Sequence, residues 1–189
     1  MHDEQPKLVI LDRDGVINRD SQAFIKSPHE WVALPGSIEA IARLCRAGFR
    51  VVIATNQSGV GRGLFSEQTL DDIHAKLEAA VEAGGGRISG VFVCPHLPEA
   101  GCDCRKPRPG LLNQIASAFD VALTAIPMIG DSLRDLEAAV AVGGQAVLVR
   151  TGNGRTTEQR VNQAWRVRVY DDLASAADAI ITGEIKANE

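Results

Sequence analysis

Residues 8–18, LVILDRDGVIN, decide the fold of this chain. The segment from Leu8 to Leu11 is a continuous apolar run, which is typical of a strand buried in a parallel sheet. It ends in two carboxylates one residue apart, Asp12 and Asp14, and Gly15 then lets the chain turn. Ligands of open α/β sheets bind beyond the carboxyl ends of the strands, so this pair is expected at a functional edge. Taken alone, the pattern also fits a strand that ends in a polar turn.

Length and composition indicate one globular domain. The chain has 189 residues, of which 45% are hydrophobic and 23% are charged, as is usual for a globular protein. Its formal net charge of −4 excludes a broadly basic surface for nucleic acid. No apolar stretch approaches the roughly 20 residues of a membrane span, and residues 1–6 lack the pattern of a signal peptide. We therefore expect a single domain over residues 1–189, located in the cytoplasm.

Apolar runs alternate with amphipathic segments, which predicts βαβ units and a mostly parallel sheet. The expected strands cover residues 8–11, 49–54, 88–93, 127–130, 145–149 and 167–169. The expected helices cover residues 37–48, 67–83, 109–119, 133–142 and 172–181, with Ser37 and Ser66 as N-caps. Residues 19–35 are expected to form a functional loop, 151–157 another loop, and 183–189 a frayed end. The fold class is therefore α/β, a three-layer, Rossmann-like sheet flanked by helices.

Four polar stretches follow the expected strands and meet at one edge of the sheet. They contain Asp12 and Asp14, Thr55 and Asn56, Arg105 and Lys106, and Asp131 and Asp135. This combination suits phosphoryl transfer to a carboxylate nucleophile. Asp12 and Asp131 would bind Mg²⁺, and the ion and Lys106 together would offset the repulsion between phosphate and carboxylates. The Thr55 hydroxyl and backbone N–H groups near Asn56 would hydrogen-bond the phosphoryl group.

These stretches resemble the four motifs of the haloacid-dehalogenase superfamily of phosphatases, over about residues 8 to 150. The resemblance implies that Asp12 is the nucleophile and forms an aspartyl-phosphate. It implies that Asp14 is the acid for the leaving alcohol and then the base for the hydrolytic water. Mg²⁺ would bind the Asp12 carboxylate, the Asp14 main-chain oxygen and Asp131. Asp135 would support the metal or the lysine, or be a solvated helix position, and Arg134 is expected at the surface.

Three longer strings resemble those of the D-glycero-D-manno-heptose 1,7-bisphosphate 7-phosphatases and related histidinol-phosphatases. They are DRDGVIN at 12–18, TNQSG at 55–59 and CPH at 94–96. This implies a fold without a large cap domain. It also implies removal of the 7-phosphate in nucleotide-activated heptose biosynthesis for lipopolysaccharide or related glycans, with histidinol phosphate or another small sugar phosphate as the alternative substrate. Expected substrate contacts are Asp20, Asn56, Gln57 and Arg105. Ser132 stands where many of these phosphatases have lysine, so one positive charge is missing.

The cysteine pattern predicts a structural zinc site. The pattern C-x-H-x5-C-x-C is formed by Cys94, His96, Cys102 and Cys104. Without a secretory signal, such a cluster favours a metal over a disulfide, and three thiolates with one imidazole make a closed tetrahedral Zn²⁺ site. An accidental group of thiols and a redox pair are the alternatives. Zinc would hold the loop 94–108 so that Lys106 points at the phosphate. Cys45, outside the pattern, is expected in the core.

Two other classes of protein fit parts of this pattern less well. A phospho-accepting receiver domain also has Asp, Lys and Mg²⁺ at strand ends, but it lacks a zinc loop and an acid in the position of Asp14. A zinc module that binds nucleic acid or protein would have a basic, aromatic face. We therefore expect a monomeric phosphatase with a small phosphorylated sugar as its partner, and neither nucleic acid nor membrane.

Overall fold

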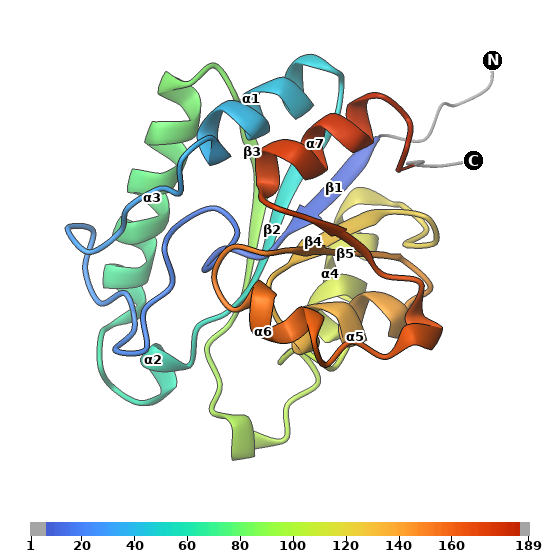
Figure 1. The fold of residues 1–189 in the computed structure, drawn as a ribbon. Coiled ribbons are helices and arrows are strands. Elements are labelled where there is room, and N and C mark those ends of the chain that lie inside the picture. The colour runs from blue at the N-terminus through green and yellow to red at the C-terminus, as the bar shows by residue number, and fades with distance from the viewer. Residues whose placement is uncertain (1–6, 186–189) are drawn as a thin grey trace.

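The computed structural model describes residues 7–185 as one parallel sheet with helices on both faces (Figure 1). The strands are β1 (Leu8–Leu11), β2 (Arg50–Asn56), β3 (Ile88–Cys94), β4 (Pro127–Gly130), β5 (Gln145–Val149) and β6 (Arg168–Tyr170). Their order is β3-β2-β1-β4-β5-β6, and each neighbouring pair is parallel. This is the order of a doubly wound sheet, whose switch point lies between β1 and β4. The predicted fold class is confirmed.

Side chains alternate between the two faces of β1, so the strand contributes to two cores. Val9 and Leu11 pack with α1 (Ser37–Arg46), α3 (Glu67–Ala83) and α7 (Leu173–Ile181). Leu8 and Ile10 pack with α4 (Gly110–Phe119) and α5 (Leu133–Ala141) on the opposite face. Because β1 is covered on both faces, it reads as an uninterrupted apolar run, and its first polar residue marks the edge of the sheet.

The expected helices and strands agree with the structure within a few residues, and two short helices were missed. These are α2 (Ser58–Gly61) and α6 (Gly154–Glu158), and α6 begins inside residues 151–157, which were expected to be a loop. Single turns of this length carry no periodic apolar pattern. The three-residue turns η1 (Pro98–Ala100) and η2 (Gln163–Trp165) were missed for the same reason.

One of the two expected helix caps is wrong. Ser66 caps α3 as predicted, accepting a hydrogen bond from the Thr69 backbone N–H. The residue before α1 is Gly36, whose φ of 76° places it in the left-handed region that favours glycine. Ser37 is the first residue of the helix instead, and its hydroxyl donates to the carbonyl oxygen of Ile17 at 2.7 Å. It therefore ties the helix to the turn that follows β1.

The loop of residues 19–35 is held firmly against α3. Ile25 and Trp31 are buried in the core. Lys76 from α3 donates to the carbonyl oxygens of Pro28 and Trp31, at 2.7 and 3.1 Å. The loop therefore has a defined course beside the edge of the sheet where β1 ends.

The expected fraying of residues 183–189 is wrong for residues 183–185. The side chain of Ile185 is fully buried, and its backbone N–H donates to the carbonyl oxygen of Ala179 at 3.0 Å. Residues 186–189, like 1–6, lie outside the described part of the chain. In the described part, none of the helices combines the length and the apolar character that crossing a bilayer requires.

We expect Ile185→Ala to lower the free energy of unfolding by about 2–4 kcal/mol, because it leaves a cavity in the core. Ile181→Ala is the matched control, since Ile181 is 38% exposed and should cost less than about 1 kcal/mol. Urea unfolding followed by circular dichroism measures both values. Equal losses for the two variants would contradict the anchoring of this segment.

Candidate active site

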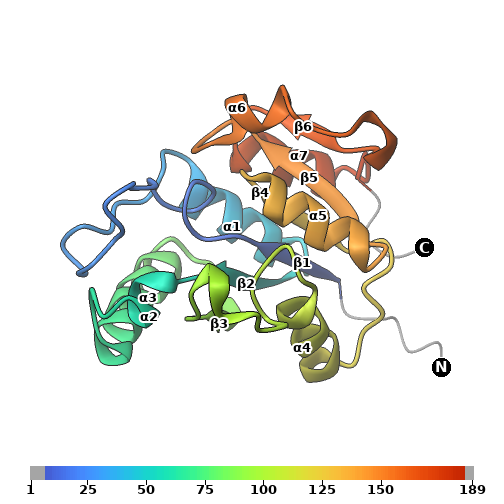
Figure 2. The same ribbon diagram turned by 90° about the horizontal axis from the view of Figure 1, so that it is seen from below.

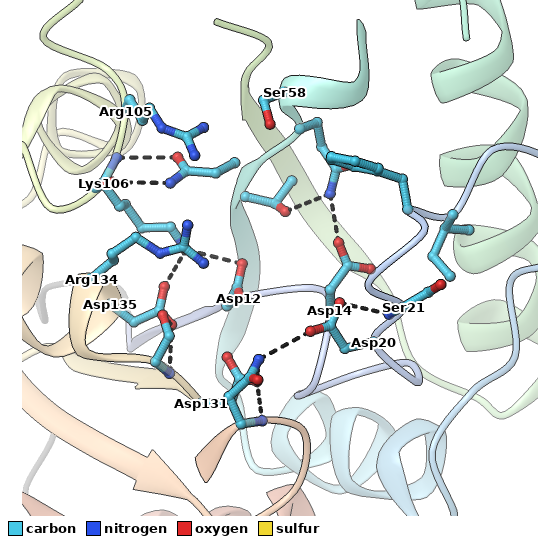
Figure 3. Close-up of a pocket in the computed structure, with 17 residues that line it drawn as sticks. Asp12, Asp14, Asp20, Ser21, Ser58, Arg105, Lys106, Asp131, Arg134 and Asp135 are labelled. Carbon is cyan, nitrogen blue, oxygen red and sulfur yellow. Dashed lines mark hydrogen bonds and ion pairs between the residues drawn. The ribbon is translucent and has the colours of Figure 1, made fainter. Parts of the chain in front are cut away.

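The ends of β1 and β4 place Asp12 and Asp131 side by side at the switch point of the sheet. The backbone N–H of Asp12 donates to the carbonyl oxygen of Ile129 at 2.9 Å, which joins the two strand ends. Figure 2 shows the molecule from below, with β1 between β2 and β4. All predicted catalytic, substrate-binding and magnesium-binding residues line one polar pocket at this edge. Figure 3 shows Asp12 between Lys106 on one side and Asp14 on the other.

Lys106 is buried, with 4% of its surface exposed, and lies between two carboxylates. Its Nζ is 2.9 Å from Oδ1 of Asp12 and 2.6 Å from Oδ1 of Asp135, and it also donates to the carbonyl oxygen of Ala54 at 2.7 Å. Burial opposes the charged form, yet the two carboxylates raise the pKa of Lys106 above its ordinary value. The lysine is therefore a permanent cation beside Asp12.

Asn56 positions the backbone of Lys106. Its Oδ1 accepts from the Lys106 N–H at 3.1 Å, and its Nδ2 donates to the Lys106 carbonyl oxygen at 3.0 Å. The peptide bond between Lys106 and Pro107 is cis. Asn56 was expected to contact substrate, but these bonds turn the amide toward the lysine-bearing segment. The second N–H of Nδ2 and the second lone pair of Oδ1 are not used by these bonds, so contact of Asn56 with substrate stays a prediction.

Asp14 is held by donors from three directions. Nε and Nη2 of Arg13 lie 2.9–3.1 Å from its two carboxylate oxygens. Asn18 donates to Oδ1 and Gln57 to Oδ2, both at 2.8 Å. Gln57 also donates to the hydroxyl of Thr55 at 3.0 Å. Gln57, expected to contact substrate, therefore links the predicted acid/base to the threonine.

Three carboxylates at the edge fit a divalent cation. One oxygen each from Asp12, Asp131 and Asp135 lies within 4.8 Å of the others. Burial, together with the charges of Asp12 and Asp135, raises the pKa of Asp131 to about 8. Burial also raises the pKa of Asp12 to about 6, and Lys106 offsets only part of this effect. Lys106 supplies one positive charge for these three carboxylates, and clustered carboxylate oxygens are donors that Mg²⁺ prefers.

Asp135 supports this cluster from the first turn of α5. Its Oδ1 pairs with Lys106, and its Oδ2 accepts from the backbone N–H and the hydroxyl of Ser132, at 3.1 and 2.6 Å. These contacts outweigh burial and lower the pKa of Asp135. The solvated alternative considered for this residue is therefore wrong, because the side chain is buried and fully paired.

Asp131 is enclosed by two glycines and by a residue that the sequence did not indicate. A Cβ at Gly15 or Gly152 would lie 2.1 or 2.2 Å from its Oδ2, and both glycines have positive φ. The backbone N–H and the side-chain amide of Asn153 donate to the same oxygen, at 2.7 and 3.1 Å. The signal available in the sequence was the Thr-Gly-Asn-Gly run of residues 151–154, which follows β5 at the same edge.

The outer wall of the pocket carries positive charge. Arg105 and Arg134 lie on the Lys106 side (Figure 3). Burial and the charges of Arg134 and Arg62 lower the pKa of Arg105. Arg134 is exposed, as expected, but it lines the pocket. On the opposite wall, Asp20 accepts from the side chain of Asn153 at 3.0 Å. Ser21, Phe24 and Ile25, from the loop that was expected to be functional, also line the pocket, as does Ser58.

The predicted zinc ligands converge in the loop of residues 94–108. The sulfur atoms of Cys94, Cys102 and Cys104 are 3.2–3.7 Å apart. Nδ1 of His96 lies 3.6 Å from the sulfur of Cys94 and 3.2 Å from that of Cys104. A tetrahedron with Zn–S bonds of about 2.3 Å has edges of about 3.8 Å, so the four atoms suit a closed structural zinc site. Arg105 and Lys106 follow the last cysteine directly.

Two family models match the chain. The "HAD-hyrolase-like" model matches residues 103–176. The "Polynucleotide kinase 3 phosphatase" model matches residues 7–133, more than half of the chain. The first agrees with the superfamily that the four motifs indicated.

Curated relatives and a solved structure narrow this assignment. The D-glycero-beta-D-manno-heptose-1,7-bisphosphate 7-phosphatase of Bordetella bronchiseptica is 53% identical over 93% of this chain and 98% of its own length. The phosphatase of the same name from Pseudomonas putida is 52% identical over 93% and 99%. The crystal structure of the B. bronchiseptica protein, complexed with magnesium and phosphate, covers 93% of this chain and 98% of that one with a TM-score of 0.91. The chain therefore belongs to the haloacid-dehalogenase-like hydrolases, in the family of the D-glycero-beta-D-manno-heptose-1,7-bisphosphate 7-phosphatases.

Proposed function

We propose that this chain removes the 7-phosphate of D-glycero-β-D-manno-heptose 1,7-bisphosphate through an aspartyl-phosphate on Asp12. The observation that carries the proposal is the contact of Asp12 with buried Lys106, with Asp131 and Asp14 beside it in one pocket. The names of the relatives support the substrate. The reaction would serve nucleotide-activated heptose biosynthesis for lipopolysaccharide or related glycans, as expected from the sequence.

In the first half-reaction the Asp12 carboxylate attacks phosphorus. The bond from phosphorus to the sugar oxygen breaks, and Asp14 gives its proton to that oxygen. Lys106 and the Thr55 hydroxyl stabilise the negative charge on the phosphoryl oxygens. Mg²⁺, bound by Asp12, the main-chain oxygen of Asp14 and Asp131, would add positive charge at the same oxygens.

In the second half-reaction Asp14 takes a proton from water, which then attacks the aspartyl-phosphate and regenerates Asp12. A carboxylate two residues after the nucleophile explains why the phosphoryl group is released. A receiver domain, by contrast, retains its phosphoryl group. Gln57 and Asn18 keep Asp14 facing the pocket for both steps.

The cationic wall suits the second phosphate of the substrate. Arg105 and Arg134 both line the pocket, and the mutual repulsion that contributes to the lowered pKa of Arg105 would be relieved by a bound anion. We propose that Arg134 supplies the charge that Ser132 lacks. Asp20, on the opposite wall, would accept hydrogen bonds from the sugar hydroxyls.

We further propose that the enzyme acts in the cytoplasm as a monomer, with one phosphatase domain over residues 1–189 and without nucleic acid or membrane as a partner. Among the described residues, the exposed large hydrophobic side chains are few: Val32, Leu64 and Ile181. An obligate interface normally presents a larger apolar surface.

Asp12→Asn should lower kcat by at least about a thousandfold, because the nucleophile is lost. The same purified variant should keep its far-ultraviolet circular dichroism. Release of inorganic phosphate from the β and α anomers of the heptose bisphosphate, and from histidinol phosphate, measures both turnover and substrate class. Retained turnover in the variant would exclude the covalent route, and a preference for histidinol phosphate would replace the proposed substrate.

Arg134→Gln should raise KM for the heptose bisphosphate by about tenfold, since one charge-assisted hydrogen bond to phosphate is lost. KM for the heptose 7-monophosphate should stay within about twofold, because that substrate has no second phosphate to bind. Arg46→Gln is the matched control, an exposed arginine on α1. A parallel rise for both substrates would remove the second-phosphate role.

Cys102→Ser should release zinc and lower kcat by about tenfold or more, because the loop would no longer hold Lys106 in place. Zinc content by atomic absorption and kcat are measured on the same preparation. Cys45→Ser, outside the loop, should keep both values. Full activity in zinc-free Cys102→Ser protein would separate the loop from catalysis.

A further inference from the structure

Arg13 is a buried cation directly behind the site, between the nucleophile and Asp14 in the sequence. Its side chain is 0% exposed. A buried guanidinium group is tolerated only when it is paired and hydrogen-bonded. Its charge is paired with Asp14, through three contacts from Nε and Nη2. The edge of the guanidinium that carries these two nitrogens therefore faces the Asp14 carboxylate.

The opposite end of the same guanidinium contacts a histidine from a distant helix. Nη1 of Arg13 lies 3.2 Å from Nε2 of His74, a buried residue in the middle of α3. An arginine nitrogen can only donate, so Nε2 of the histidine accepts and its proton sits on Nδ1. Burial and the charge of Arg13 lower the pKa of His74 to about 4, which leaves the ring neutral near pH 7.

We propose that His74 is a positioning residue for the acid/base Asp14 and acts through Arg13. The planar guanidinium is bonded along one edge to Asp14 and at its far end to His74, so its rotation within the plane is blocked. Without the acceptor, Nη1 would be a buried donor lacking a partner, which costs stability and is relieved when the group shifts. A shift of Arg13 would carry the Asp14 carboxylate with it, since the two are joined by three contacts.

A purely packing role for His74 predicts a different result. α3 would then need only a side chain of similar volume at this position, and leucine would serve. In the proposed role, the hydrogen-bond acceptor is the part that matters. The inference rests on the proposed acid/base role of Asp14, and the experiment below separates failure of one from failure of the other.

The test compares two substrates in their demand for a general acid. The heptose bisphosphate releases an alkoxide that needs a proton, whereas p-nitrophenyl phosphate releases a stable phenolate that does not. The value of kcat/KM reports steps up to alcohol release. His74→Leu should lower it by about tenfold or more for the sugar phosphate and by less than about threefold for the aryl phosphate. His74→Gln, which retains an acceptor, should restore most of the loss.

Leu77→Ala on the same helix is the control for lost packing, since Leu77 is fully buried. It should lower the melting temperature but leave the ratio of the two kcat/KM values unchanged. Equal losses on both substrates in His74→Leu, or the same selective loss in Leu77→Ala, would overturn the inference.

Asp14→Asn is assayed alongside, so that failure of the His74 role can be told from failure of the acid/base role of Asp14. If Asp14→Asn shows the selective loss and His74→Leu does not, only the role of His74 fails; if Asp14→Asn shows none, the acid/base proposal fails as well.

Discussion

The ammonium group of Lys106, buried between Asp12 and Asp135, is the interaction on which the rest of the active site depends. It joins three segments that are distant in the sequence: the end of β1, the Cys-rich loop and the first turn of α5. Removing Lys106 would leave the two carboxylates buried without a counter-charge, whereas removing either carboxylate would leave Lys106 with the other one as its partner. Asn56 holds the backbone of Lys106 through two hydrogen bonds, and the cluster of three cysteines and His96 lies in the same loop as the lysine.

A second pair of a buried cation and a carboxylate, Arg13 and Asp14, lies beside Asp12. Lys106 and Asp135 surround Asp12, while Arg13 and its neighbours surround Asp14. The two carboxylates of the first motif therefore have different environments, although they are one residue apart. Asp12 lies against the permanently charged Lys106, whereas Asp14 is held by donors from the turn after β1 and from Gln57. This difference supports a division between attack and proton transfer.

Much of the fold and many of the site residues were predictable, because the carboxyl ends of parallel strands meet at one edge. Strand ends before Asp12 and Asp131 were visible as apolar runs that stop at a carboxylate. The bounds of α3 were predicted correctly because seventeen residues carry a clear periodic pattern. The pocket position of Arg134 was missed, since a single helix residue carries no pattern that reports its spatial neighbours. Asn153 was missed although the glycine-containing run around it follows β5 at the same edge.

The sequence by itself determined the fold class, the edge that carries the chemistry and the residue types gathered there, because burial and chain direction leave local patterns. Only the tertiary structure decided which atoms pair. The contact between Lys106 and Asp12 spans 94 positions, and the one between Arg13 and His74 spans 61. Asn56 shows the consequence, since its place at the site was predictable but its partner was not. Hydrogen-bond partners depend on distances of a few tenths of an ångström between separate elements, which only the packed sheet and helices define.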